Sequence, residues 1–137
     1  PAPPLLPCAP RERAYVRAIA QLIACDIHPL NNLRVLQYLK QQLNFDDEAQ
    51  TCWYHHWVRR GLETIERELQ KFPASIYCFG MTPTIADCFL APQIFNAQRF
   101  GINISDLKRT VAVHEACMSL SAFQKAHPSS CLDAEIS

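Results

Sequence analysis

The sequence predicts an all-α domain, and this prediction rests on three observations. Only three glycines occur in 137 residues, and no segment alternates polar and apolar residues between hairpin turns, so β-strands have little support. Apolar residues instead recur every three or four positions over long stretches, which is the period of an amphipathic helix. Recognisable helix start and stop signals separate these stretches. A chain of this length is expected to form one domain with its own hydrophobic core.

The first predicted helix runs from Glu12 to about Leu43. Pro29 lies inside it, removes one backbone donor and clashes with the carbonyl group four residues earlier, so we expect a kink there. We expect Leu33 to point into the bundle, together with a core-facing stripe that consists of Val16, Ile19, Ile23, Ile27 and Leu30.

The second predicted helix opens after Asp46 or Asp47, either of which can cap it, and ends near Lys71, before a proline. Its expected core-facing residues recur every four positions and are Ala49, Trp53, Trp57, Gly61, Ile65 and Leu69. Gly61 inside this helix costs about 1 kcal/mol relative to alanine. We therefore expect another backbone segment to pack closely against it.

The third predicted helix has the clearest start signal, in the stretch "TPTIADCFL". Thr84 is the expected N-cap and Asp87 the expected N3 residue of a capping box. The following residues are apolar nearly all round, which predicts a buried central helix, and Gly101 can end it in the left-handed conformation. Water cannot reach the first amides of a buried helix, so replacing Thr84 or Asp87 with alanine is expected to cost about 1–2 kcal/mol.

Two shorter helical elements are expected after Gly101. A fourth helix runs from about Asp106 to Leu120, and the stretch "SAFQKA" forms a short turn of helix that packs back through Phe123. The last residues, "SSCLDAEIS", are expected to form an arm on the surface. Together these helices predict an orthogonal or bundled all-α domain.

Charge and composition exclude several function classes. Thirteen basic and thirteen acidic residues cancel, so nucleic acid and anionic membranes are not expected partners. No apolar run approaches the roughly 18 residues that span a bilayer. The adjacent His55 and His56 cannot easily share one metal ion on a helix, and no metal site is expected. Seven cysteines without C-x-x-C spacing are expected mostly in the helical core, which indicates a reducing, cytoplasmic location.

The first ten residues, "PAPPLLPCAP", contain five prolines. Proline-rich segments of this kind act as semi-rigid connectors. We therefore expect residues 1–10 to be an interdomain linker and residues 11–137 to be the helical domain. An ordinary extended N-terminal arm is the alternative interpretation.

Polar residues interrupt the first predicted helix in the stretch "CDIHPLNN". On an uninterrupted helix His28, Asn31, Asn32 and Val35 fall within about 100° of one another. One hypothesis is that this face lines a ligand site. The alternative is that the histidine and the asparagines only satisfy the backbone groups that Pro29 leaves free.

Four stretches resemble the C-terminal domain of the cytosolic glutathione transferases. They are "PPLLP", "RAIAQLIACDIHPLNNLRVLQYL", "GMTPTIADCFLAPQIFNAQRF" and "AFQKAHP". The motifs "CDIHPLNN" and "PQIFNAQRF" resemble the zeta class in particular, and the resemblance covers essentially the whole chain. Three positions depart from the family pattern: Met81 replaces an acidic residue, Lys108 replaces a proline, and "CLDA" stands where the family tends to have "QPDA". These departures put loop details in doubt.

The resemblance implies an all-α, glutathione-transferase C-terminal-like bundle and a function. The bacterial members of the zeta class are maleylacetoacetate and maleylpyruvate isomerases. The chain is therefore expected to be the substrate-site half of a glutathione-dependent cis–trans isomerase, with maleylacetoacetate ranked first and maleylpyruvate second. The family's thioredoxin-like N-terminal domain, which supplies most of the glutathione site and the thiol-activating motif, matches nothing in these residues. We expect no catalytic residue here, no activity from this chain alone, and a homodimer in the full-length family.

Arg99 is the first candidate substrate-binding residue. The resemblance implies this role through the motif "NA-x-RF", and a guanidinium group suits the carboxylates of a dicarboxylate substrate because it can pair two N–H groups with two oxygens. The alternative is an arginine that only complements the helix dipole. The resemblance also implies that His28, Asn31 and Asn32 reach glutathione or substrate. Arg34 is a further candidate, with a solvated arginine as its alternative.

A function from another class remains open. A free-standing helical module of this fold could act only as a protein-interaction platform. A thioredoxin-like reading frame ahead of "PAPPLLP" in the source gene would indicate the enzyme, and its absence would indicate the module.

Overall fold

The structure is a computed structural model that describes residues 4–130. Within that range it contains helices and no strand, which confirms the predicted all-α fold. The elements in chain order are α1 (Pro10–Gln21), the π-helical turn η1 (Leu22–Ile27), α2 (His28–Asn31), α3 (Leu33–Gln42), α4 (Asp47–Leu69), α5 (Ile85–Arg99), α6 (Lys108–Met118), α7 (Ser121–Lys125) and the 3₁₀ turn η2 (Pro128–Ser130). The predicted arm over residues 131–137 lies outside the described residues.

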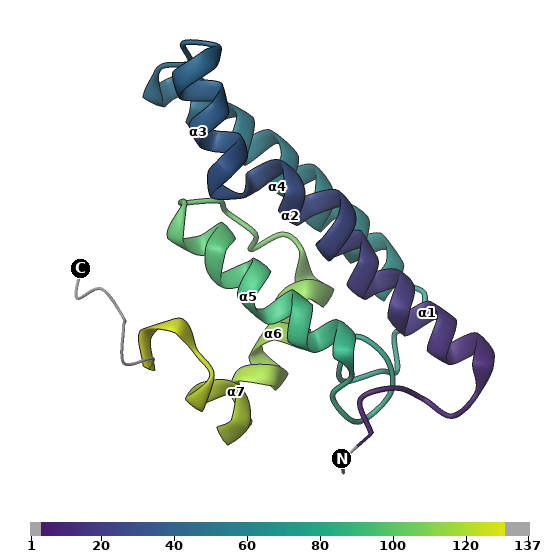
Figure 1. The fold of residues 1–137 in the computed structure, drawn as a ribbon. Helices are drawn as coiled ribbons and strands as arrows, with labels where there is room; N and C mark the ends of the chain where they lie inside the picture. Colours follow the sequence, from purple (N-terminus) through teal and green to yellow (C-terminus); the bar gives the residue numbers. More distant parts are fainter. Residues whose placement is uncertain (1–3, 131–137) are drawn as a thin grey trace.

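The helices form two layers (Figure 1). In one layer α1, η1, α2 and α3 follow one another along the length of α4. In the other layer α5 packs against α1 and η1, and α6 packs against both α4 and α5. α5 begins near α1 and runs toward the α2–α3 end of the molecule, so its C-terminal end lies at that end of the bundle.

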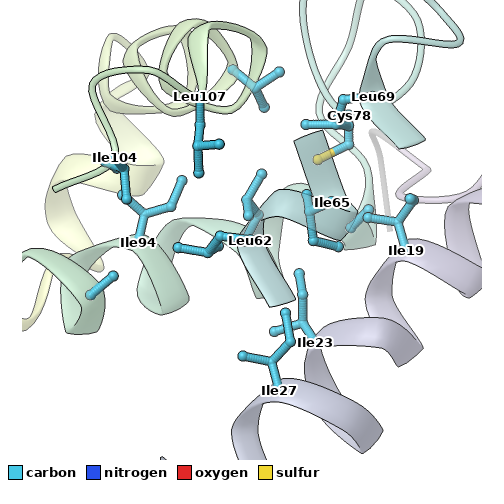
Figure 2. Close-up of a cluster of buried hydrophobic side chains, with 14 of the residues drawn as sticks. Ile19, Ile23, Ile27, Leu62, Ile65, Leu69, Cys78, Ile94, Ile104 and Leu107 are labelled. Carbon is cyan, nitrogen blue, oxygen red and sulfur yellow. The ribbon is translucent and has the colours of Figure 1, made fainter. Parts of the chain in front are cut away.

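The hydrophobic core lies between these layers (Figure 2). Side chains from both layers and from the loop before α6 converge on it, among them Ile19, Ile23, Ile27, Leu62, Ile65, Leu69, Cys78, Ile94, Ile104 and Leu107. The predicted phase of α4 is only partly right, because Tyr54 and Val58 are buried in this core whereas Trp53 and Trp57 are half-buried. The two indole rings lie 5.7 Å apart, outside the main core.

Gly61 lies at a close contact between α4 and η1. A Cβ atom at this position would lie 2.5 Å from Cγ1 of Ile27, whose side chain is only 2% exposed. The close packing predicted at Gly61 is confirmed, but the nearest atoms belong to the Ile27 side chain of η1 and not to another backbone.

We expect Gly61→Ala to destabilise the chain by about 1–3 kcal/mol, because a buried isoleucine must move to admit the methyl group. Urea denaturation would measure the loss. Gly80→Ala is not a suitable control, since Gly80 has a φ angle of 74° and strain would enter there as well. Ala18→Gly, at an exposed position of α1, is the better control for helix propensity alone.

The sequence predicted that the cysteines lie mostly in the core, and this prediction was wrong. Cys78 and Cys117 are buried, whereas four others, Cys8, Cys25, Cys52 and Cys88, are exposed free thiols. Cys131 lies outside the described residues. Their distribution follows helix phase, which small residues do not reveal because both faces of a helix accept them.

The start of α5 is held by a buried carboxylate. Asp87 is 0% exposed, and its Oδ2 accepts hydrogen bonds from the Thr84 amide (2.7 Å) and hydroxyl (2.8 Å). The predicted capping box is therefore present. Oδ1 of Asp87 also accepts from the Cys78 amide at 2.8 Å, and the Ile85 amide donates to the Leu5 carbonyl at 2.8 Å. The cap thus ties two distant loops to α5.

The start of α6 is capped by a residue of another helix. Glu66 on α4 is 7% exposed, and its carboxylate accepts from the amides of Arg109 (3.0 Å) and Thr110 (2.7 Å) and from the Thr110 hydroxyl (2.7 Å). Burial raises the pKa of Glu66, but these hydrogen bonds and one from Gln70 outweigh burial, so the net pKa is lowered. α6 has no N-cap side chain of its own, so Glu66 joins α4 to α6.

Glu66→Gln is expected to lower the free energy of unfolding by about 2–3 kcal/mol at neutral pH, because an amide cannot accept all of these bonds. A lowered pKa in the folded state stabilises the protein above the unfolded pKa, and that contribution is lost as pH falls through the folded value. The difference between wild type and variant should therefore be full above about pH 5 and shrink below about pH 4. Urea denaturation across pH would test this, and the exposed Glu115→Gln should show little effect at any pH. A difference independent of pH would contradict it.

Candidate functional site

The first predicted helix is broken, and the break lies at Asn32 rather than at Pro29. Ahead of Pro29 the helix widens into the π-helical η1, in which the His28 amide donates to the Ile23 carbonyl five residues back. This wider turn accommodates the proline ring without a break. Asn32 then adopts extended backbone angles and caps α3, because its Oδ1 accepts from the Val35 amide at 3.2 Å.

The polar residues of this segment differ in their surroundings. His28 and Arg34 are exposed, and Asn31 is 7% exposed with an amide nitrogen that has no hydrogen-bond partner within residues 4–130. Both polar atoms of Asn32 bond to backbone groups, its Nδ2 donating to the Pro29 carbonyl at 3.1 Å. Asn32 therefore has the structural role that the sequence left open as an alternative.

The single-face arrangement expected from a helical wheel does not extend across Asn32, because the helix stops there. His28 and Asn31 still lie three residues apart within α2 and therefore on one side of it. The expectation for Leu33 was wrong, since its side chain is 70% exposed.

Arg99 is the last residue of α5, and its side chain is exposed. Within the described part of the chain it forms no hydrogen bond and no ion pair, whereas Arg59 pairs with Glu63 and Asp106. An exposed guanidinium without an internal carboxylate is available to a ligand. The same position also complements the negative end of the α5 dipole.

One turn of α4 contacts both parts of this site. Trp53 donates from its Nε1 to the Leu30 carbonyl at 2.8 Å, which satisfies a carbonyl group at the α2–α3 break. Tyr54 stacks on the Phe100 ring with centroids 4.0 Å apart, and the His55 Nε2 lies 2.7 Å from the Phe100 carbonyl oxygen. The α2–α3 break and the end of α5 are therefore both fixed to the same turn.

We call this part of the surface the α2–α5 corner and define it by His28, Asn31, Asn32, Arg34 and Arg99. It contains two exposed guanidinium groups without acid partners in the described chain, and their N–H groups are hydrogen-bond donors; the unpartnered amide nitrogen of Asn31 is enclosed by the chain's own atoms. Such donors suit carboxylate groups. Trp53 and Tyr54, which hold the corner, were missed as site residues, because the sequence shows them only as aromatic residues of an amphipathic helix.

An apolar cavity of about 270 Å³ lies on the outer face of α5, against the end of α6 and α7. Its wall on α5 includes Cys88, Pro92 and Phe95, and Arg99 follows Phe95 by one helical turn on the same side of the helix. The prediction that α5 is buried nearly all round is therefore wrong on this face, where Cys88 and Pro92 are exposed. Apolar walls of this kind are typical of small-molecule sites, but Arg99 is not among the residues that line this cavity.

Residues 4–130 contain neither a metal-binding cluster nor a membrane-spanning helix. No three histidine, cysteine or acidic side chains come together there in a way that could hold a metal ion. None of the helices in that range is both long enough and apolar enough to cross a membrane.

Known proteins resemble this chain in sequence and structure. A family model described as the glutathione S-transferase C-terminal domain matches residues 58–115. A maleylpyruvate isomerase from a Ralstonia species is 41% identical over 129 residues, which cover 93% of this chain and 61% of that protein. A solved maleylpyruvate isomerase, described as a bacterial zeta-class glutathione S-transferase, superposes with a TM-score of 0.95 at 40% identity, over 98% of this chain and 64% of that chain.

A further solved structure contains a ligand. The maleylacetoacetate isomerase of Anaeromyxobacter dehalogenans, with dicarboxyethyl glutathione and citrate bound in its active site, superposes with a TM-score of 0.92 at 35% identity. The match covers 99% of this chain and 60% of that one. The chain thus spans about three fifths of the length of the curated relatives that it matches.

Proposed function

We propose that this chain, which belongs to the glutathione S-transferase family and forms its C-terminal domain, is the substrate-site half of a glutathione-dependent cis–trans isomerase. Maleylacetoacetate is the proposed substrate, with maleylpyruvate as the second candidate. Relatives named for both reactions are about 40% identical to this chain. The observation that carries the proposal is Arg99, a guanidinium group exposed at the end of α5 without an acid partner in the described chain.

The α2–α5 corner fits a doubly negative ligand. Arg99 can donate two parallel N–H groups to one carboxylate, whereas the unpartnered amide nitrogen of Asn31 is enclosed by the chain's own atoms. Glutathione and the proposed substrates carry carboxylates. A relative of this chain binds dicarboxyethyl glutathione in its active site, a ligand that joins both kinds of molecule.

The proposed reaction divides the work between two domains. Bound glutathione would supply a thiol that adds reversibly to the cis double bond, which lets the bond rotate before elimination. The residues of this chain would bind and orient the substrate carboxylates, with Arg99 as the principal contact and His28, Asn31 and Arg34 as further contacts. Fixing the carboxylates lowers the entropic cost of bringing the double bond to the sulfur atom.

We also propose that the full-length protein is a cytoplasmic homodimer. Exposed apolar residues of this segment support an interface: Leu33 and Tyr38 on α3 and Leu43 directly after it are 70%, 58% and 52% exposed. Large apolar side chains that are exposed in a single chain can become buried when two subunits associate. Sedimentation of the full-length protein should show a dimer, and charged substitutions at Leu33 and Tyr38 should weaken it if this surface takes part.

The activity proposal is tested by expressing the full-length reading frame that contains this chain. The full-length protein should convert maleylacetoacetate to fumarylacetoacetate only when glutathione is present. Residues 1–137 alone should show no activity and negligible glutathione binding by calorimetry. Full-length protein without isomerase activity toward maleylacetoacetate and maleylpyruvate would contradict the proposal, and the absence of an upstream thioredoxin-like domain would favour a non-catalytic module.

A further inference from the structure

Tyr54 has a hydroxyl group without a partner. Its side chain is 3% exposed, and the hydroxyl forms no hydrogen bond within residues 4–130. The oxygen is also not among the fully enclosed atoms without partners, so the small exposed part of this residue includes the hydroxyl. Buried tyrosines usually place the hydroxyl in a hydrogen bond, as Tyr15 does by donating to the Glu68 carbonyl at 2.8 Å. Tyr54 therefore has an unused donor that is almost wholly buried but reaches solvent.

The ring of Tyr54 is fixed beside the α2–α5 corner. It stacks on Phe100 with an interplanar angle of 24°, and Phe100 directly follows Arg99. The preceding residue, Trp53, holds the α2–α3 break through the Leu30 carbonyl. A ring fixed in this way offers its hydroxyl at little entropic cost on binding.

The electrostatics keep the phenol protonated. Burial raises the pKa of Tyr54 to about 12, and the nearby charge of Arg99 has a smaller, opposite effect. The effect of Arg99 on the pKa of Tyr54 agrees with the place of the Tyr54 ring, which stacks on Phe100 at the C-terminal end of α5. Since the pKa stays far above neutral, the hydroxyl acts as a hydrogen-bond donor under physiological conditions.

We propose that the Tyr54 hydroxyl donates a hydrogen bond to the carboxylate that Arg99 binds, and so serves as a second substrate-binding residue of this site. A carboxylate has acceptor positions left after a two-pronged guanidinium contact. A neutral donor at a fixed position supplies a further hydrogen bond to the carboxylate and fixes the orientation of that group. This inference rests on the proposed function, because it requires a ligand carboxylate at Arg99.

The test uses the full-length protein and the variant Tyr54→Phe. The KM for maleylacetoacetate and the Kd for dicarboxyethyl glutathione should each rise about tenfold. The melting temperature should not change, since phenylalanine keeps the stacking on Phe100 and the lost hydroxyl has no internal partner. Tyr15→Phe is the matched control and should show the opposite pattern: a lowered melting temperature and unchanged KM and Kd.

Arg99→Ala in the same assays separates this inference from the proposed function. If Arg99→Ala raises KM and Kd while Tyr54→Phe leaves both unchanged, the Tyr54 inference is wrong and the proposed function stands. If Arg99→Ala also changes neither, the proposed substrate site itself is wrong. A lowered melting temperature of Tyr54→Phe would overturn the inference as well, because the hydroxyl would then have an internal role. Less than additive effects in the double variant would support a shared carboxylate.

Discussion

Arg99→Ala in the full-length enzyme is expected to lower kcat/KM for maleylacetoacetate by tenfold to a little over a hundredfold. A hydrogen-bonded charge pair contributes roughly 1.5–3 kcal/mol, and Arg99 has no other partner in the described chain that would take its place. Most of the loss should fall on KM, because the guanidinium binds the substrate carboxylate before and during the reaction. Steady-state kinetics with glutathione held at saturation would measure it.

Arg60→Ala is the control for this experiment. Arg60 is also exposed, and its guanidinium has no acid partner within residues 4–130, but it lines a separate hollow between α4 and residues 101–103 and is not part of the α2–α5 corner. Its replacement should leave KM unchanged. Equal effects of the two substitutions would show that general positive charge, and not a specific contact, attracts the substrate.

Asp87→Ala is expected to have the largest effect on stability, a loss of about 3–5 kcal/mol. A cap alone would contribute only about 1–2 kcal/mol. The structure raises this expectation because Asp87 is 0% exposed and also binds the Cys78 amide, so its removal leaves buried donors of two segments without partners. Urea denaturation of the chain would measure the change.

Asp26→Ala serves as the stability control, because Asp26 is exposed and makes no hydrogen bond or ion pair in the described chain. Its replacement should change the free energy of unfolding by no more than about 0.5 kcal/mol. A loss near 1 kcal/mol for Asp87→Ala would mean that the link to Cys78 contributes nothing, and that Asp87 acts only as an ordinary cap.

Features set by local chemistry could be predicted from the sequence. The Thr84–Asp87 capping box, the Asp46 cap of α4 and the left-handed Gly101 all appear where the sequence placed them. Each depends on a few neighbouring residues, whereas Gly61 signalled a close contact without showing that Ile27 of η1 makes it. The all-α fold follows from the same local rules.

Features set by contacts between distant segments could not be predicted in the same way. The break at Asn32 needs a partner for the Leu30 carbonyl, and Trp53 supplies it from 23 residues away in the chain. Glu66 caps a helix that starts more than 40 residues later. Apolar periodicity also misplaced the core face of α4, because Trp53 and Tyr54 are adjacent and both fit an amphipathic pattern.

The candidate site also has features that the sequence predicts and features that it does not. The residue types were visible in the sequence, and the resemblance to the zeta class singled out Arg99 and the segment around His28. Their spatial relation depends on one turn of α4 that contacts both, and no local signal encodes it. Tyr54 became a candidate only when its stacking on Phe100 and its unused hydroxyl were seen.

The central claim is that Arg99 binds the carboxylate of the substrate and not glutathione itself. Calorimetric titration of the full-length protein and its Arg99→Ala variant with dicarboxyethyl glutathione and with glutathione tests it most directly. Arg99→Ala should weaken binding of dicarboxyethyl glutathione at least tenfold and leave glutathione affinity unchanged, because only the former carries the additional carboxylates. Equal affinities of wild type and variant for dicarboxyethyl glutathione would contradict the account.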